Sequence, residues 1–265
     1  MTMQDRHRFA LDLAQEAGRL AQTMRADATG LRVDAKGPQD FVTAADLAVE
    51  TLIRDRITAR FPDDAIIGEE GGHHGNPDAA HVWIIDPIDG TTNFMRGLPD
   101  WAISIGCTNA GTLDLGVIFA PDLGLTLDGL CGQTPKATIN GKPLTPSTRT
   151  AAAEALVAVG WSARTHFAQH ADLLDQIVTA GGEYRRSGAA TIGLIGVAAG
   201  WVDAYVEQRL NLWDAAAGIA IIRAAGGVIE APAFSPTLRE PAPFLALGRA
   251  DHALAPLLRR YATAV

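Results

Sequence analysis

The sequence predicts an α/β fold in which helices cover mixed β-sheets in layers. Three observations support this class. Apolar residues recur at helical spacing in the first 61 residues, short β-branched runs follow between residues 65 and 139, and strand-like and helix-like segments alternate after residue 150. The chain of 265 residues is long enough for one large domain or two small ones, with an ample core in either case.

Two helices are expected at the N-terminal end. Apolar side chains three or four residues apart predict an amphipathic helix over residues 9–24. A turn is expected around Gly37 and Pro38, followed by a second helix over residues 44–61. Pro62 should end that helix, because proline lacks the backbone N–H that would continue it.

Short apolar runs separated by Gly, Pro, Asp and Asn predict strands in the rest of the first half. These strands cover residues 65–67, 82–85, 103–108, 113–119, 125–127 and 137–139. The chain is polar and then alanine-rich at residues 145–150, which is the best candidate for a boundary between two lobes. We expect the lobes to span about residues 1–148 and 149–265.

Beyond this boundary, expected strands and helices alternate. The strands cover residues 156–159, 183–185, 202–206, 228–230 and 244–247. The helices cover residues 166–180, 189–199, 214–225 and 253–261. Such alternation is typical of an α/β protein with helices packed on a sheet.

The charge balance argues against two classes of partner. Lys and Arg total 22, and Asp and Glu total 30, so the formal net charge is −8. A general nucleic-acid binder needs a basic surface to displace counterions from phosphates, and docking on anionic lipid needs one as well. We therefore expect neither direct nucleic-acid binding nor membrane attachment.

Two further features bear on the cellular compartment. Cys107 and Cys131 are too few for a disulfide framework and lack zinc-site spacing, so they are expected to be buried free thiols. Residues 1–8 are charged and resemble no signal peptide, and no run approaches the roughly 20 apolar residues of a membrane span. These features predict a cytoplasmic protein.

The most informative stretch is 83–94, which reads W-I-I-D-P-I-D-G-T-T-N-F. An apolar strand is expected to end at Asp86, Pro87 stiffens the exit, and Asp89 precedes a turn that could open a helix. Two carboxylates this close repel one another unless a cation lies between them, and an oxygen-rich cluster suits Mg²⁺ better than zinc. A helix N-terminus at Gly90 would offer N–H groups to phosphate. Together these features indicate metal-assisted phosphoryl chemistry.

Other acidic residues have ordinary explanations when each is taken alone. Asp89 and Asp214 are of a type that often caps helices, and for Asp89 by itself capping of the following helix is the favoured interpretation. Glu69 and Glu70 follow an expected strand and by themselves favour a solvated acidic loop, with at most one side chain facing a site. Glu207 follows the strand expected over 202–206, close to Asp214 in sequence.

Two histidines follow the acidic loop and invite a metal-binding interpretation. His73 and His74 precede Gly75, Asn76 and Pro77, a composition typical of loops. A mobile, solvent-exposed flap is therefore the preferred expectation for this segment.

Taken together, three motifs resemble the inositol monophosphatase family. They are G-E-E at residues 68–70, D-P-I-D-G-T-T-N-F at residues 86–94, and W-D at residues 213–214 leading to A-G-G at 225–227. Lys36 and the segments 40–46 and 185–190 also match, and the resemblance covers almost the whole chain. It implies a single phosphatase domain with αβαβα layers of the inositol monophosphatase and fructose-1,6-bisphosphatase type. It also implies a homodimer, and Mg²⁺-dependent, lithium-sensitive hydrolysis of a phosphate monoester.

The resemblance assigns metal ligands by position. Glu69, Asp86 and the main-chain carbonyl of Ile88 would hold one Mg²⁺. Asp86, Asp89 and Asp214 would hold a second, and a third, weaker Mg²⁺ would lie near Glu69.

Catalytic and substrate-binding roles follow from the same resemblance. Glu69 and Thr91, the latter paired with Asp46, would orient and activate the attacking water, and the N–H groups of Gly90 and Thr91 would hold phosphate oxygens. Residues matching substrate contacts are Ile88, Asp89, Gly90, Thr91, Arg185, Gly188, Ala189, Ala190, Glu207 and Asp214. Relatives often have Ser or Thr where this chain has Ala189, so the alcohol part of the substrate stays open.

We therefore expect a small phosphorylated alcohol as substrate, with inositol 1-phosphate as the leading candidate. Histidinol phosphate, fructose 1,6-bisphosphate and 3′-phosphoadenosine 5′-phosphate are alternatives within the same chemistry. A second hypothesis, from a different class, is a binding protein of the transcription machinery. The proline-rich segment 232–243 does not match the family in detail and is assigned no role.

Overall fold

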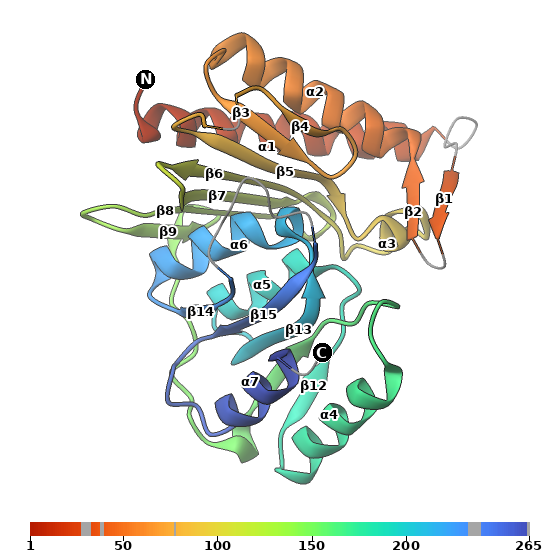
Figure 1. The fold of residues 1–265 in the computed structure, drawn as a ribbon, viewed down its shortest axis with the longest axis vertical. Coiled ribbons are helices and arrows are strands. Elements are labelled where there is room, and N and C mark those ends of the chain that lie inside the picture. The colour runs from red at the N-terminus through yellow and green to blue at the C-terminus, as the bar shows by residue number, and fades with distance from the viewer. Residues whose placement is uncertain (28–32, 38–39, 77, 233–239, 264–265) are drawn as a thin grey trace.

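Two large β-sheets and the helices around them form five layers, αβαβα (Figure 1). The computed structural model describes residues 1–27, 33–37, 40–76, 78–232 and 240–263. α1 (Met3–Ala26) and α2 (Ala44–Arg60) cover the outer face of the first sheet. α5 (Ala190–Ala198) and α6 (Leu212–Ala225) lie between the two sheets. α4 (Phe167–Thr179) and α7 (Ala255–Thr263) cover the far face of the second sheet, so the layered α/β class expected from the sequence is confirmed.

The first sheet has eight strands in the order β10-β9-β8-β7-β6-β5-β3-β4. Neighbouring strands are antiparallel except β3 and β5, which are parallel. Their bounds are β3 (Ala65–Gly68), β4 (Gly72–His74), β5 (Val82–Asp89), β6 (Ala102–Asn109), β7 (Thr112–Ala120), β8 (Leu125–Leu130), β9 (Lys136–Ile139) and β10 (Lys142–Pro143).

The second sheet has five strands in the order β12-β11-β13-β15-β14. β11 runs parallel to β12 and β13, whereas β15 is antiparallel to β13 and β14. The bounds are β11 (Leu156–Val159), β12 (Glu183–Arg185), β13 (Ala204–Leu210), β14 (Val228–Glu230) and β15 (Ala242–Leu247). A separate hairpin of β1 (Val33–Gly37) and β2 (Asp40–Thr43), the short helix α3 (Thr91–Met95) and two 3₁₀ turns, η1 (Pro121–Leu123) and η2 (Ala152–Glu154), complete the described elements.

A row of glycines allows α6 to pack closely against the first sheet. Gly106, Gly116 and Gly129 occupy paired positions on the neighbouring strands β6, β7 and β8. A Cβ atom on Gly116 would lie 2.1 Å from the carbonyl oxygen of Ala217 in α6, and one on either of the other two would lie within 3.1 Å of the α6 backbone. The row therefore lets α6 approach the sheet backbone to backbone. This close packing of α6 on the sheet brings Asp214, in the first turn of α6, close to β5.

We expect Gly116→Ala to destabilise the protein by about 3 kcal/mol or more, because the added methyl group would meet α6 backbone that cannot rotate away. Urea unfolding measures this cost. Gly111→Ala is the control: its Cβ would enter open space, so only the strain of a positive φ, about 1–2 kcal/mol, should appear. Equal costs for the two variants would contradict the seating role of the glycine row.

Several expected elements differ from those observed. α1 begins at Met3 rather than at residue 9, because Thr2 and Asp5 form a capping box that fixes its first turn. The β1–β2 hairpin was not predicted, and Pro38 of the expected turn lies outside the described residues. Residues 72–74 form β4, paired with β3, so the mobile flap expected at His73 and His74 is wrong for this part of the chain.

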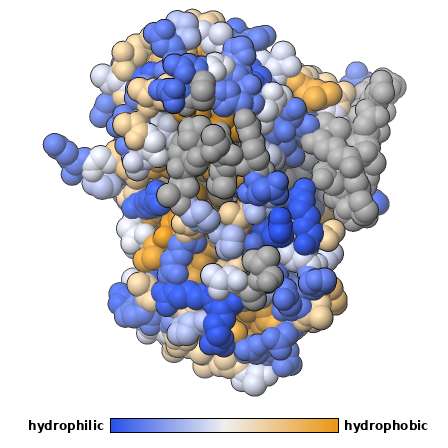
Figure 2. Space-filling view, in the orientation of Figure 1, coloured by the Kyte–Doolittle hydropathy of each residue, from blue (hydrophilic) through white to orange (hydrophobic). Residues whose placement is uncertain are grey.

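Other observations concern the surface and the thiols. Both cysteines are free, with Cys107 buried as expected and Cys131 only partly buried. No helix in the described part of the chain is long and apolar enough to cross a membrane. On the coloured surface in Figure 2, apolar side chains are scattered among hydrophilic ones. Of the proline-rich segment 232–243, residues 233–239 lie outside the described part.

Candidate metal centre and substrate pocket

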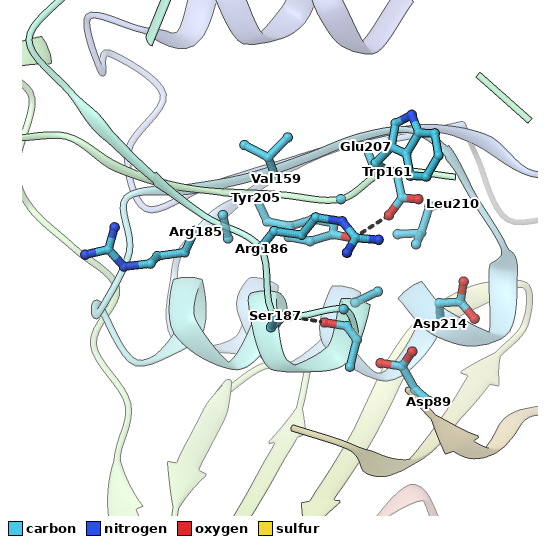
Figure 3. A pocket seen from close by; sticks show the side chains of 15 residues that line it. Asp89, Val159, Trp161, Arg185, Arg186, Ser187, Tyr205, Glu207, Leu210 and Asp214 are labelled. Carbon is cyan, nitrogen blue, oxygen red and sulfur yellow. Dashed lines mark hydrogen bonds between the residues drawn. The ribbon is translucent and has the colours of Figure 1, made fainter. Parts of the chain in front are cut away.

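Three carboxylates from two distant parts of the chain meet at one end of a pocket. Asp86 and Asp89 come from β5, and Asp214 comes from the first turn of α6. One oxygen of each carboxylate lies within 4.8 Å of the others. Figure 3 shows Asp89 and Asp214 side by side at the end of the pocket. The structure thus brings together three of the acids that the sequence singled out.

A β-bulge explains how Asp86 and Asp89 share a side of β5. In a regular strand, residues three apart point to opposite faces. The pairing of β5 with β6 shifts register between Asp86 and Asp89, where Pro87 has no N–H to give to a ladder. The extra residue re-aims the second carboxylate toward the side of the first. The expectation that the strand ends at Asp86 is therefore wrong, because β5 continues through the bulge to Asp89.

The N-terminus of α5 holds Asp89 in place. Asp89 Oδ2 accepts hydrogen bonds from the backbone N–H of Thr191, at 2.6 Å, and from the Thr191 hydroxyl. The interpretation of Asp89 as the cap of the following helix is wrong, because α3 begins after Gly90 and has no side-chain cap. Asp89 instead places its charge at the positive end of α5, a helix of the other half of the chain. Its carboxylate also belongs to the three-carboxylate cluster.

Asp214 is held by the loop that precedes α6. Its Oδ2 accepts hydrogen bonds from the backbone N–H and the side-chain amide of Asn211, at 3.3 and 3.1 Å. Asp214 is therefore the third residue of α6, in a capping box, rather than its N-cap. The position is rigid because the glycine row seats the helix it belongs to.

Burial and mutual repulsion make it energetically unfavourable for all three carboxylates of this cluster to be ionised when no cation is bound. Burial is the largest cause that raises the pKa of each of Asp86, Asp89 and Asp214. For Asp86, the nearby charges of Glu69, Asp89 and Asp214 raise the pKa further. A bound cation removes this cost, and a set of carboxylate oxygens suits a hard divalent ion. The cluster therefore fits a metal such as Mg²⁺.

Glu69 follows β3, and the loop that carries it is held by a buried ion pair from α2. Glu50 is 3% exposed, and its carboxylate accepts hydrogen bonds from the backbone N–H groups of Glu70, at 2.8 Å, and Gly71, at 2.6 Å. Arg54 donates to Glu50 at 2.7 Å and to the carbonyl oxygen of Gly72 at 2.5 Å. We call Glu50 and Arg54 the loop clamp. The clamp was not foreseen from the sequence, although an acid and a base four residues apart on a helix are a recognisable signal.

Thr91 and Asp46 lie together, as the resemblance implied. The Thr91 hydroxyl lies 3.3 Å from Asp46 Oδ1 and 3.1 Å from the carbonyl oxygen of Ile88, either of which can accept its proton. Asp46 Oδ2 also accepts from the backbone N–H of Thr43 at 2.8 Å, in the capping box of α2. Burial raises the pKa of Asp46, and the hydrogen bonds from Thr43 partly oppose that rise. Gly90, with φ of 89°, makes the turn that carries Thr91 into α3.

The pocket extends from the acidic cluster to Glu207 as a cavity of about 140 Å³. Glu207 lies inside β13 rather than beyond the end of a strand at residue 206. Its Oε2 accepts a hydrogen bond from the Tyr205 hydroxyl at 2.5 Å. Burial raises the pKa of Glu207 to about 7, although the Tyr205 hydrogen bond opposes this. Gly160 makes room for the pair, because a Cβ there would lie 2.1 Å from Glu207 Oε2.

The loop before α5 forms the opposite wall of the pocket. Gly188, Ala189 and Ala190 all line it, as the resemblance implied. Asn93 in α3 fixes this loop by donating from one amide nitrogen to the carbonyl oxygens of Ser187, at 2.9 Å, and Asp100, at 2.7 Å. Asn93 therefore ties the first half of the chain to the second, a role not foreseen from the sequence.

Other expected residues lie apart from this cluster. Arg185 is at the pocket rim, but its side chain points away from Asp89 and Asp214 (Figure 3) and donates to Glu183 Oε2 at 3.2 Å. His73 and His74 stand on β4 at the sheet edge and belong to no metal-ligating group that the described residues form.

Comparison with known proteins identifies the family of this chain. The model of the inositol monophosphatase family matches residues 2–261. Inositol-1-monophosphatase from Rhizobium meliloti is 36% identical over 200 residues, 74% of each chain. Nus factor SuhB from Salmonella typhimurium is 34% identical over 224 residues, 84% of this chain and 83% of that one. The crystal structure of extragenic suppressor protein suhB from Bartonella henselae covers 97% of this chain and 98% of its own, with TM-score 0.85 and 28% identity.

The family is metal-dependent, and the three-carboxylate cluster is a place where this chain can hold a metal. The chain therefore belongs to the inositol monophosphatase family and is a phosphatase that hydrolyses phosphate monoesters.

Proposed function

We propose that this phosphatase is Mg²⁺-dependent and hydrolyses a small phosphorylated alcohol, with inositol 1-phosphate as the leading substrate, to the alcohol and inorganic phosphate. The observation that carries the proposal is the convergence of Asp86, Asp89 and Asp214 at the end of a polar pocket. Relatives named inositol-1-monophosphatase in Rhizobium meliloti and Caulobacter vibrioides support the choice of substrate. We propose one phosphatase domain of two lobes, which span about residues 1–148 and 149–265.

In this proposal the acidic residues hold Mg²⁺ in two or three sites. Glu69, Asp86 and the carbonyl of Ile88 would hold one ion, and Asp86, Asp89 and Asp214 another, with a weaker third near Glu69. When bound, the ions would neutralise the phosphate dianion and lower the pKa of the attacking water.

The chain's own groups would then position water and phosphate. The Thr91 hydroxyl, held by Asp46, can accept a hydrogen bond from the attacking water while it donates its own proton to Asp46. The Glu69 carboxylate would accept the second proton of that water. The N–H groups of Gly90 and Thr91 would hold phosphate oxygens at the start of α3, and Glu207 with the Gly188–Ala190 loop would contact hydroxyl groups of the alcohol.

A substrate panel tests the proposal. Purified protein is assayed with inositol 1-phosphate, histidinol phosphate, fructose 1,6-bisphosphate and 3′-phosphoadenosine 5′-phosphate, each with Mg²⁺ and with EDTA. We expect Mg²⁺-dependent phosphate release, with the highest kcat/KM for inositol 1-phosphate. A clear preference for another member of the panel would replace the proposed substrate, and equal release in EDTA would contradict the metal dependence.

A second candidate function rests on the relatives named Nus factor SuhB. Those names support a role as a binding partner of the transcription machinery. Absence of phosphate release from every monoester in the panel would favour that role, because a binding protein needs no hydrolysis.

The resemblance also supports further properties that we propose here: a homodimer, inhibition by lithium, and a cytoplasmic location. Light scattering after size-exclusion chromatography should give twice the monomer mass of 27.9 kDa. Lithium should lower phosphate release at fixed Mg²⁺, and a monomer mass or insensitivity to lithium would contradict the respective property.

We expect the loop clamp to set the affinity for Mg²⁺. Glu50→Gln removes the charge that pairs with Arg54 and weakens the hold on the Glu69 loop. The Mg²⁺ concentration for half-maximal activity should rise about tenfold, the effect typical of groups that orient metal ligands, whereas kcat at saturating Mg²⁺ should change far less.

Titration of activity with Mg²⁺, together with calorimetry of Mg²⁺ binding, measures this change. Arg56→Gln, also on α2, is the matched control, because it breaks an exposed ion pair with Glu16 of α1, and it should leave the Mg²⁺ dependence unaltered. A lower melting temperature of Glu50→Gln with unchanged Mg²⁺ affinity would show that the clamp serves stability alone.

A further inference from the structure

The pocket extends beyond the acidic cluster, past the volume that a phosphate group bound at the cluster would fill. Beyond Asp89 and Asp214 it is bounded by Trp161, Arg186 and Glu207 (Figure 3). The alcohol part of a substrate whose phosphate lies at the acidic cluster must enter this outer space. The side chains here are therefore placed to contact the alcohol part of the substrate.

Arg186 is the unusual residue of this outer space. Its guanidinium carbon lies 6.0 Å from the centre of the Trp161 ring, within the range of a cation–π contact. Among the residues that the structure describes, its guanidinium makes no hydrogen bond or close ion pair, although its charge acts on Glu207 from nearby. Arg185 beside it is different, because it donates to Glu183 and to the carbonyl oxygen of Tyr184 and points away from the pocket. Arg186 thus keeps its donors available on the pocket side.

The charge of the outer pocket is set by the groups around Glu207. Arg186 and Arg164 both act on Glu207 as nearby positive charges, and Asp89 acts on it as a negative charge. Metal bound at the acidic cluster would offset the charge of Asp89. Glu207 accepts a hydrogen bond from Tyr205 rather than from Arg186, so the guanidinium of Arg186 stays open to a substrate anion. The guanidinium of Arg186 attracts a negatively charged substrate group and repels an ammonium group.

We propose that Arg186, oriented by Trp161, binds the second anionic group of those phosphate monoesters that carry one, and so extends the substrate range beyond inositol 1-phosphate, whose alcohol part has only hydroxyl groups. A guanidinium is planar and presents paired N–H donors, which match the oxygens of a carboxylate or a phosphate. The proposal rests on the proposed function, since it assumes that a phosphate monoester occupies the acidic cluster. It makes Arg186 a specificity-determining residue for substrates with two acidic groups.

Two matched substrate pairs test this role. 6-Phosphogluconate and glucitol 6-phosphate differ only in a carboxylate against a hydroxymethyl group, and fructose 1,6-bisphosphate and fructose 1-phosphate differ in the second phosphate. For each pair, the kcat/KM of the substrate with the second anion is divided by the kcat/KM of the substrate without it. This ratio reports the contribution of the second anion. Arg186→Gln should lower the ratio about 10- to 100-fold in at least one pair, as expected for loss of a charge-assisted hydrogen bond. The pair that responds identifies the anion as carboxylate or phosphate.

Two further variants make the test specific. Arg185→Gln removes the same charge one residue away and should change the ratio less than about twofold, since its screened charge faces solvent. Arg186→Lys keeps the charge without the paired donors and should restore only part of the ratio. Equal ratios in the wild-type protein and Arg186→Gln in both pairs, with phosphate still released, would overturn the role of Arg186 alone. Absence of release from all four substrates would overturn the proposed function and, with it, this inference.

Discussion

Asp89→Asn should lose nearly all phosphatase activity while the protein stays folded. The substitution removes one negative charge and one proposed ligand from the cluster of Asp86, Asp89 and Asp214. We expect kcat/KM to fall about 10³-fold or more, because charge neutralisation is the main catalytic task for a phosphate dianion. The fold should survive because the amide oxygen of Asn can still accept the two hydrogen bonds from Thr191.

The same variant should melt at a higher temperature than the wild-type protein when both are free of metal. Burial raises the pKa of Asp89, so a neutral side chain suits this position better than a carboxylate. Phosphate release and thermal unfolding in EDTA measure the two effects. Near-full turnover of Asp89→Asn at saturating Mg²⁺ would contradict the proposed metal centre.

Asp128→Asn is the matched control for Asp89→Asn. Asp128 is also buried, but hydrogen bonds from His7 and Thr138 outweigh the effect of burial and lower its pKa. Its stabilising contribution is therefore present above the pKa of the unfolded chain, near 4, and is lost in acid. At pH 7 we expect Asp128→Asn to lower the melting temperature and to leave kcat close to the wild-type value, the opposite of Asp89→Asn in both respects.

The stabilisation by Mg²⁺ should grow as pH rises from 5 to 8. In the metal-free protein, the pKa values of Asp86, Asp89 and Asp214 are raised above those of the unfolded chain, near 3.9. The stability that these groups contribute is complete below that value and is lost as pH rises through the raised pKa values. The stability that Glu207 contributes, with its pKa of about 7, is likewise lost as pH rises. Mg²⁺ must displace the protons held by these carboxylates, so it binds more tightly at higher pH.

Thermal unfolding with and without 10 mM Mg²⁺, at several pH values, measures this effect. Each kcal/mol of added stability raises the melting temperature by about 2–4 °C in a protein of this size class. We expect a small Mg²⁺-induced shift at pH 5 and a shift of on the order of 10 °C at pH 8, which corresponds to several kcal/mol. The difference between the two curves cancels the titration of groups remote from the metal. A shift that does not depend on pH would contradict the assignment of these carboxylates as ligands.

Much of the secondary structure follows from local pattern. The strands expected at 156–159, 183–185 and 228–230 coincide with β11, β12 and β14, because short β-branched or aromatic runs between turns leave little freedom in their bounds. The bulge in β5 could not be predicted, since it depends on the pairing of β5 with β6. The glycine row could not be predicted for the same reason. The alignment of Gly106, Gly116 and Gly129 across neighbouring strands follows from the strand register, which the sequence does not give.

The candidate site likewise has residues that the sequence predicts and residues that it does not. The carboxylates of Asp86, Asp89 and Asp214 were identified from motif spacing and resemblance, and the structure brings them together. The adjacent residues Arg185 and Arg186 could not be told apart in sequence, because both precede the same loop. Only the path of the chain after β12 turns one toward the pocket and the other away from it. Glu50 was missed for a related reason, since it acts on a loop 20 residues away along the chain.

The central claim is that Asp86, Asp89 and Asp214 form the metal centre of this phosphatase. The most direct test is an anomalous difference map from crystals soaked in Mn²⁺, which binds oxygen-ligand sites of the Mg²⁺ type and scatters anomalously. We expect a peak bounded by these three carboxylates, with any further peak beside Glu69. A map without density between the three carboxylates, or with Mn²⁺ bound only elsewhere, such as at His73 and His74, would contradict the claim.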